Sequence, residues 1–117
     1  MNKHEKDRTK PIYLISVVCD ILGVHPQTLR LYEREGLIHP LRRKTQRLYS
    51  ESDIERLNLI LQLTRELGVN KAGVDIILRM RRRMEVLQNE MEEMMQLFED
   101  DVKADFRERL RRALEED

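Results

Sequence analysis

The chain has few of the residues that build cross-linked or membrane-bound proteins. Its 117 residues include one cysteine, no tryptophan and only 4% aromatic side chains. A single cysteine excludes an internal disulfide framework and any metal site made of clustered cysteines. No apolar run approaches the ~20 residues that a membrane span requires, and the N-terminus lacks a signal-peptide pattern. We therefore expect a soluble cytoplasmic protein with no membrane partner.

The sequence also lacks the groupings that suggest an active site. Its three histidines, His4, His25 and His39, are scattered and have no accompanying cluster of carboxylates or cysteines. We expect no catalytic residues, no metal site and no cofactor. The 38% charged residues favour helices with solvated faces over a large β-sandwich core.

The net charge is zero, but the charges are unevenly distributed. Residues 1–50 contain ten Lys/Arg and five Asp/Glu, whereas residues 51–117 contain twelve Lys/Arg and seventeen Asp/Glu. Phosphates respond to the local field rather than to the total charge, so a basic N-terminal half is compatible with DNA binding.

Residues 25–36 (HPQTLRLYEREG) are predicted to form a short helix with a defined start and end. Pro26 suits the first helical position, since its missing N–H needs no partner there, and Gly36 suits the left-handed position just past the end. Upstream lies an apolar run, residues 17–22, that ends at Gly23. Two short helices joined by a glycine-containing turn are typical of a helix-turn-helix, whose second helix enters the DNA major groove.

The first of these helices follows a short β-rich segment, residues 12–15, and Ser16 is predicted to be its N-cap. Cys19 lies within this helix. It is either a small packed residue or a redox sensor, and the first role is the more common for a single cysteine on an apolar helix.

Residues 41–49 (LRRKTQRLY) are predicted to form a small β-hairpin with a basic tip. A basic hairpin beside a helix-turn-helix is a wing, and its charges would lie against the phosphates that flank the major groove. The alternative is a solvated run of charge. The basic residues at and near the tip are Arg42, Arg43, Lys44 and Arg47.

Further helices follow the hairpin. Ser50 and Asp53 form a capping-box pattern at the start of an amphipathic helix that ends near Leu67–Gly68, and Asn70 can cap the next helix. From Ile77 apolar residues step by alternating threes and fours, which is a heptad seam. We predict that this seam pairs with a second subunit, although its methionines also suit a promiscuous binding surface. The seam consists of Ile77, Met80, Met84, Leu87, Met91, Met94 and Phe98.

The segment from Ser16 to about Met84 resembles the MerR family of bacterial transcription regulators. The resemblance rests on residues 28–38 (TLRLYEREGLI), on Pro40 and Arg42, on residues 47–50 (RLYS), on Asp53, Ile54 and Leu57, and on residues 68–70 (GVN). Within the family, residues 13–17 and 25–30 are most similar to the HspR-type heat-shock repressors.

The resemblance implies a winged helix-turn-helix, a homodimer joined by an antiparallel coiled coil, and a pseudo-palindromic operator. Proteins similar to HspR repress chaperone operons with the DnaK chaperone as co-repressor. Two departures stand out: family members often have an aromatic residue where Leu31 stands, and the wing usually turns at a glycine where Thr45 and Gln46 stand. The predicted DNA-contacting residues are Gln27, Thr28, Arg30, Tyr32, Arg42, Arg43, Lys44, Arg47 and Tyr49.

The sequence therefore predicts a mainly α protein with four parts. These are a flexible arm (1–11), a winged helix-turn-helix domain (12–75), a coiled-coil dimerisation helix (76–98) and a charged tail (99–117), which could fold back, bind a partner or fray. The predicted function is a dimeric, sequence-specific repressor of heat-shock or chaperone genes. The alternatives are a MerR-type regulator of other genes, an architectural DNA-binding protein and a coiled-coil adaptor.

Overall fold

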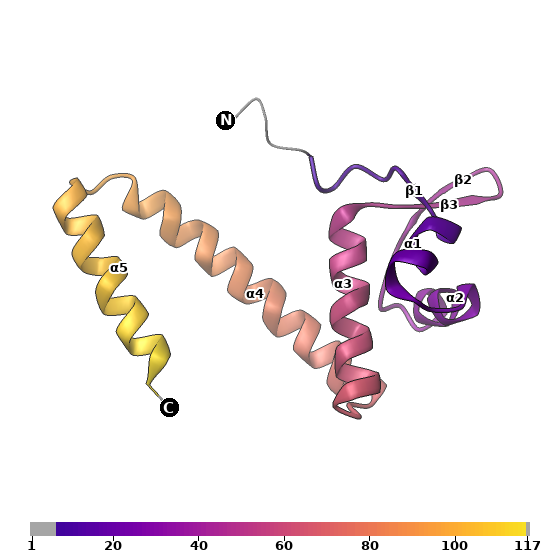
Figure 1. Ribbon diagram of the computed structural model, residues 1–117. Coiled ribbons are helices and arrows are strands. Elements are labelled where there is room, and N and C mark those ends of the chain that lie inside the picture. Colours follow the sequence, from indigo (N-terminus) through magenta and orange to yellow (C-terminus); the bar gives the residue numbers. More distant parts are fainter. Residues whose placement is uncertain (1–6, 117) are drawn as a thin grey trace. The chain divides into compact units, whose positions relative to one another are not determined.

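The computed structural model describes residues 7–116, and it is mainly helical with one small sheet (Figure 1). The mainly α class with a β wing is therefore confirmed. The elements in chain order are β1 (Tyr13–Leu14), α1 (Ile15–Leu22), α2 (Pro26–Arg34), β2 (Leu41–Arg43), β3 (Gln46–Tyr49), α3 (Glu51–Leu61), the π-helical η1 (Gln62–Glu66), α4 (Lys71–Met95) and α5 (Asp100–Glu115).

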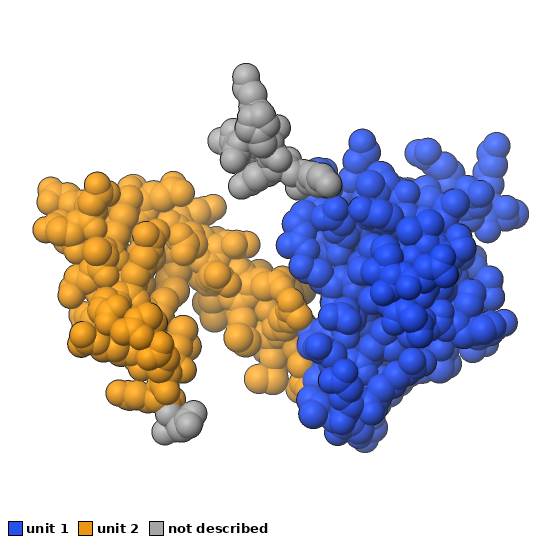
Figure 2. All heavy atoms as spheres, viewed as in Figure 1, with its two compact units in different colours: residues 1–75 blue, residues 76–117 orange. Residues whose placement is uncertain are grey.

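The chain divides into two compact units, residues 1–75 and 76–117, which Figure 2 colours blue and orange. The first unit contains the sheet and helices α1, α2 and α3. Helix α4 begins in the first unit and continues into the second, which also contains α5.

The sheet of the first unit is antiparallel, with strand order β1-β3-β2. Leu48 on β3 pairs with Leu14 on β1 and with Leu41 on β2, so the hairpin is held to the strand that leads directly into α1. Backbone hydrogen bonds thus attach the wing to the start of the helix-turn-helix.

Helices α1, α2 and α3, the start of α4, strand β3 and the segment after α2 contribute buried apolar side chains to the core of the first unit, whereas β2 is exposed throughout. The largest fully buried side chains come from helices, strands and loops alike, and burying each contributes ~1.5–3 kcal/mol. These side chains are Val18, Leu29, Ile38, Tyr49, Leu57, Ile60 and Val74. Tyr49 therefore anchors strand β3 of the wing in the same core as the helix-turn-helix.

The predicted helix ends are confirmed for α3 and α4. Ser50 Oγ accepts from the Asp53 N–H at 3.0 Å while the Ser50 N–H donates to Asp53 Oδ2 at 2.9 Å, which is a complete capping box. Asn70 Oδ1 accepts from the Gly73 N–H at 2.9 Å at the start of α4. Beyond α3 the chain continues through η1 and turns at Gly68, which has φ +66°.

The prediction that Ser16 caps α1 is wrong. Helix α1 begins at Ile15, directly after β1, and its N-cap is Leu14, which makes no side-chain capping hydrogen bond. Ser16 lies one position inside the helix because the strand passes into the helix with no intervening loop.

The described part of the predicted arm does not behave as a free segment. The Arg8 carbonyl accepts hydrogen bonds from the N–H of Ser52 at 3.0 Å and from its hydroxyl at 3.1 Å. The Arg8 guanidinium forms ion pairs with Glu51 and Glu55. Arg8 thereby joins this part of the arm to the start of α3, and residues 1–6 lie outside the described residues.

In the second unit the chain turns back after α4. Met95, the last residue of α4, is buried, and Arg107 of α5 lies 3.8 Å from Glu92 of α4. Of the three possibilities for the tail, the structure shows a helix that folds back. Across residues 7–116, no helix has both the length and the apolar character needed to cross a membrane.

Candidate nucleic-acid interface

Helix α2 has the predicted start and end. His25 is its N-cap and accepts the Gln27 N–H through Nδ1 at 3.0 Å, and Pro26 follows at the first helical position. Gly36 has φ +75°, and the Leu37 N–H donates to the Tyr32 carbonyl at 2.9 Å, so the chain leaves the helix through a left-handed glycine turn.

The two sides of α2 differ sharply in burial. Leu29 and Tyr32 lie in the core, whereas Gln27, Leu31 and Arg34 are exposed, and Thr28 and Arg30 are partly exposed. Helical spacing places Gln27, Arg30, Leu31 and Arg34 together, opposite the buried side chains. We call these four side chains the outward face of α2. Arg34 and Leu31 were not among the predicted contact residues.

Tyr32 and Tyr49, two of the predicted DNA-contacting residues, are buried, which favours a role in the core over a contact with DNA. Tyr32 is 7% exposed and its hydroxyl lies 3.3 Å from Thr64 Oγ1, at the π-helical segment. Tyr49 is 0% exposed. Burial, together with the charge of Glu33, raises the pKa of Tyr49 to about 12, so its hydroxyl stays neutral. Both tyrosines are part of the core against which α2 and β3 pack.

The predicted wing is the β2–β3 hairpin. Arg43 pairs with Gln46, so Lys44 and Thr45 alone connect the two strands. Lys44 has φ +58°, a left-handed conformation in which glycine is usual. The tight turn leaves Arg43 and Lys44 exposed at the tip.

Glu33 joins helix α2 to the wing. Its Oε2 accepts a hydrogen bond from Arg42 Nη2 at 3.0 Å and another from Arg47 Nε at 2.8 Å. Arg42 and Arg47 are directly opposite each other on β2 and β3, where two like charges would repel. The carboxylate offsets that repulsion and fixes the arginines beside the outward face of α2.

The electrostatics of Glu33 agree with this geometry. Burial of its side chain, which is 15% exposed, would raise its pKa. The hydrogen bonds and charges of Arg42 and Arg47 outweigh that effect and hold the pKa of Glu33 below its usual value. This role of Glu33 could not be predicted from the sequence, because it depends on the pairing of Arg42 with Arg47 across the hairpin.

Comparison with known proteins identifies the family. Residues 13–81 match the model of the MerR HTH family regulatory proteins. The chain belongs to the MerR family.

Several individual proteins are similar to this chain, each over a different length. The chain is 41% identical over 88 residues to the putative heat shock protein HspR of Streptomyces coelicolor, an alignment that covers 74% of this chain and 58% of that protein. It is 33% identical over 101 residues to the regulator TnrA of Bacillus subtilis, covering 86% and 89%. It is 33% identical to the regulator GlnR of Bacillus anthracis over 66% of this chain and 60% of GlnR. The chain thus spans about 60% of the length of HspR and GlnR.

A solved structure supports the same conclusion. HiNmlR, a MerR family regulator that lacks the sensor domain, was crystallised bound to promoter DNA. It superposes with a TM-score of 0.51 and 27% identity, covering 87% of this chain and 77% of HiNmlR. The winged helix-turn-helix expected from the MerR resemblance is therefore present.

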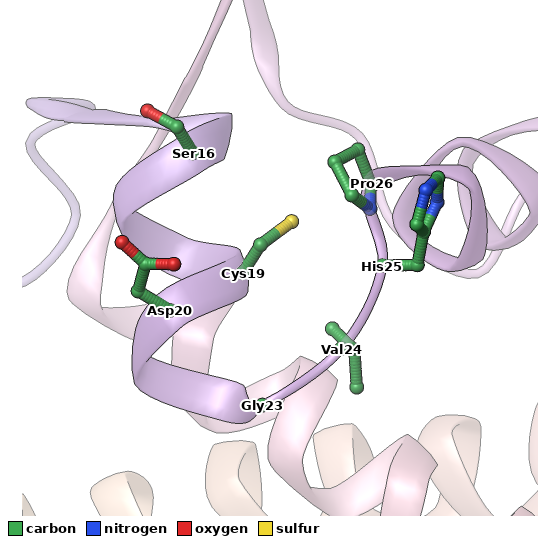
Figure 3. Close-up of a pocket in the computed structure, with 7 residues that line it drawn as sticks. All are labelled: Ser16, Cys19, Asp20, Gly23, Val24, His25 and Pro26. Carbon is green, nitrogen blue, oxygen red and sulfur yellow. The ribbon is translucent and has the colours of Figure 1, made fainter.

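A hollow of about 540 Å³ lies at the turn between α1 and α2 (Figure 3). The Cys19 side chain points from α1 toward the segment of Val24, His25 and Pro26. Burial, with a smaller contribution from Asp20, raises the pKa of the Cys19 thiol, which favours packing over redox sensing. Among residues 7–116, no group of three or more His, Cys, Asp or Glu side chains is placed to hold a metal ion.

The predicted dimerisation seam lies along α4. Met80, Met84, Leu87 and Met94 are each more than half exposed, whereas Ile77 and Met91 are partly exposed. Helix α4 ends at Met95, so Phe98, the last predicted seam residue, lies in the turn before α5 and outside the helix. The sequence predicted a helix that reaches Phe98 because the heptad spacing continues to that residue and no glycine or proline interrupts it.

Proposed function

We propose that this MerR-family chain is a sequence-specific DNA-binding transcription regulator. The observation that supports it best is the junction at Glu33. This carboxylate holds the wing arginines Arg42 and Arg47 against α2, the helix whose outward face carries Gln27, Arg30 and Arg34. A helix with exposed Gln and Arg side chains suits base edges, and an adjacent basic hairpin suits the flanking phosphates.

In this proposal α2 enters the major groove. Gln27 and Arg30 have the chemistry to bind adenine and guanine edges, respectively, and Thr28 contributes a hydroxyl beside them. Arg42, Arg43, Lys44 and Arg47 contact the backbone on either side of the groove. The promoter-bound state of HiNmlR supports DNA as the partner.

We further propose a homodimer that binds an inverted-repeat operator. The exposed apolar seam of α4 needs a partner that removes it from water, and the same seam of a second copy matches its spacing. Charge along α4 favours an antiparallel pair. Arg79, Arg81, Arg82 and Arg83 precede Leu87, the middle of the seam, whereas Glu90, Glu92 and Glu93 follow it. An antiparallel arrangement brings these opposite charges together.

We propose that the protein acts in the cytoplasm and that the genes it represses are heat-shock or chaperone genes. The similarity to the putative heat shock protein HspR of Streptomyces supports this choice. The resemblance to HspR-type repressors makes the DnaK chaperone the candidate co-repressor. The similarity to GlnR and TnrA supports a second candidate, a MerR-type regulator of other genes.

The test is a genome-wide DNA pull-down with the purified protein, scored for an enriched motif. An inverted repeat upstream of chaperone genes is the expected result, and purified DnaK would then be added to measure a gain in affinity. An inverted repeat at other promoters would keep the regulator and remove the chaperone assignment. No enriched motif, from protein shown to be folded and dimeric, would favour an architectural protein or a coiled-coil adaptor.

A further inference from the structure

Leu31 is the one apolar side chain on the outward face of α2. It is 41% exposed and lies one helical turn from Gln27 on one side and from Arg34 on the other. Leu29 and Tyr32, its buried neighbours on the same helix, occupy the opposite side. Leu31 is therefore only partly covered, and along the helix axis it lies between Gln27 and Arg34 on the outward face.

The chemistry of leucine limits what this side chain can contact on DNA. Its side chain has neither a hydrogen-bond donor nor an acceptor, so it cannot bind a phosphate or a base edge through a polar contact. The C5-methyl group of thymine is the apolar group that base pairs present in the major groove. A leucine among Gln and Arg side chains is thus complementary to a thymine methyl beside bases that are read by hydrogen bonds.

We propose that Leu31 is a specificity-determining residue that contacts a thymine methyl group in each half-site. This inference rests on the proposed function, because it requires α2 to lie in the major groove. Gln27, one turn away, has the chemistry to bind adenine, and every adenine is paired with a thymine. Together the two side chains favour A·T pairs in the part of the half-site that they face.

The test replaces thymines by deoxyuridine, one at a time, in a synthetic duplex that contains the enriched inverted repeat. Each replacement removes a single methyl group and leaves the hydrogen-bonding edge intact. We expect one position in each half-site at which the wild-type protein loses about fourfold in affinity, which corresponds to ~0.8 kcal/mol for one buried carbon. Leu31→Ala should bind the unmodified duplex more weakly and lose its sensitivity at that position only.

Two further variants control the experiment. Leu14→Ala removes a leucine with the same exposed fraction, 41%, from β1 rather than α2, and should keep the full deoxyuridine response. Leu31→Met retains an apolar side chain of similar volume and should keep most of the deoxyuridine response. Circular dichroism and thermal unfolding establish that each variant is folded.

Three results would overturn the inference. The wild-type protein could respond to none of the deoxyuridine replacements, or Leu31→Ala could respond at the same position as the wild type. In both cases the regulator stands and only the role of Leu31 fails. If the wild-type protein bound the repeat and random duplexes equally, the proposed function would fail, and the role of Leu31 in specificity would fail with it.

Discussion

Glu33 accepts hydrogen bonds from two arginines that would otherwise repel each other across the hairpin. We expect Glu33→Gln to lower the free energy of unfolding by about 1–2 kcal/mol, because Arg47 is largely buried and loses a charged acceptor while Arg42 can turn to water. Urea unfolding at neutral pH measures the change. Glu35→Gln, at the end of the same helix, is the matched control and should leave the stability nearly unchanged.

The same ion pairs predict a pH dependence. Since the pKa of Glu33 is lowered in the folded protein, its stabilising effect is fully present above the ordinary carboxyl value and is lost as the pH falls through the lowered one. The difference in unfolding free energy between the wild type and Glu33→Gln should therefore shrink on acidification. A difference that stayed constant down to low pH would show that the charge of Glu33 is unimportant.

Arg30 tests whether the outward face of α2 reads bases. Arg30→Ala should cost ~1–3 kcal/mol on the enriched repeat and relax selectivity at one position of each half-site, if its guanidinium contacts a guanine edge. Binding is measured at fixed salt on the repeat and on its single-base variants. Equal weakening on every sequence, with a smaller salt dependence, would instead assign Arg30 to a phosphate.

From the sequence it was easier to predict which side chains have DNA-binding chemistry than to predict which of them are exposed on the surface. Gln27, Thr28 and Arg30 are at least partly exposed, as the spacing around Leu29 implies. Tyr32 and Tyr49 could not be assigned in the same way, because a tyrosine suits a phosphate contact and an apolar core equally well. Only the packing of α2 and β3 on the core decides between the two.

At the scale of the elements, two serines provide a matched pair. Ser50 caps α3 and is itself buried, so Ser50→Ala should destabilise the protein by about 1 kcal/mol. Ser16 lies exposed inside α1 without a capping role, so Ser16→Ala should stay within about 0.5 kcal/mol of the wild type. Urea unfolding of both variants checks the pair, and equal losses would contradict the observed helix starts.

The same two serines explain how far helix ends can be predicted. The capping box at Ser50 has a partner three residues later, and that reciprocal pattern is specific. Ser16 has no such partner, and the preceding residues could be either strand or loop. The role of Glu33 was beyond prediction for a related reason, since it depends on the register of β2 and β3, which a two-residue turn without glycine does not reveal.

At the scale of the whole molecule, the proposed dimer depends on α4. Arg83 and Glu90 directly precede the seam residues Met84 and Met91, so both flank the same side of the seam. In an antiparallel pair of identical helices, positions on the same flank face each other. Arg83 of each subunit would then lie opposite Glu90 of the other, giving two symmetry-related ion pairs.

Arg83→Glu and Glu90→Arg should each weaken the dimer, because both ion pairs become repulsions. If each pair contributes ~0.5 kcal/mol and each repulsion costs as much, the loss is ~2 kcal/mol, or about thirtyfold in Kd. The double variant exchanges the charges and should restore dimerisation at low salt. Arg82→Glu, on the side of α4 away from the seam, should have little effect. Sedimentation equilibrium measures all four variants. A double variant no better than either single one would exclude the antiparallel pairing, because in a parallel pair Arg83 and Glu90 do not meet.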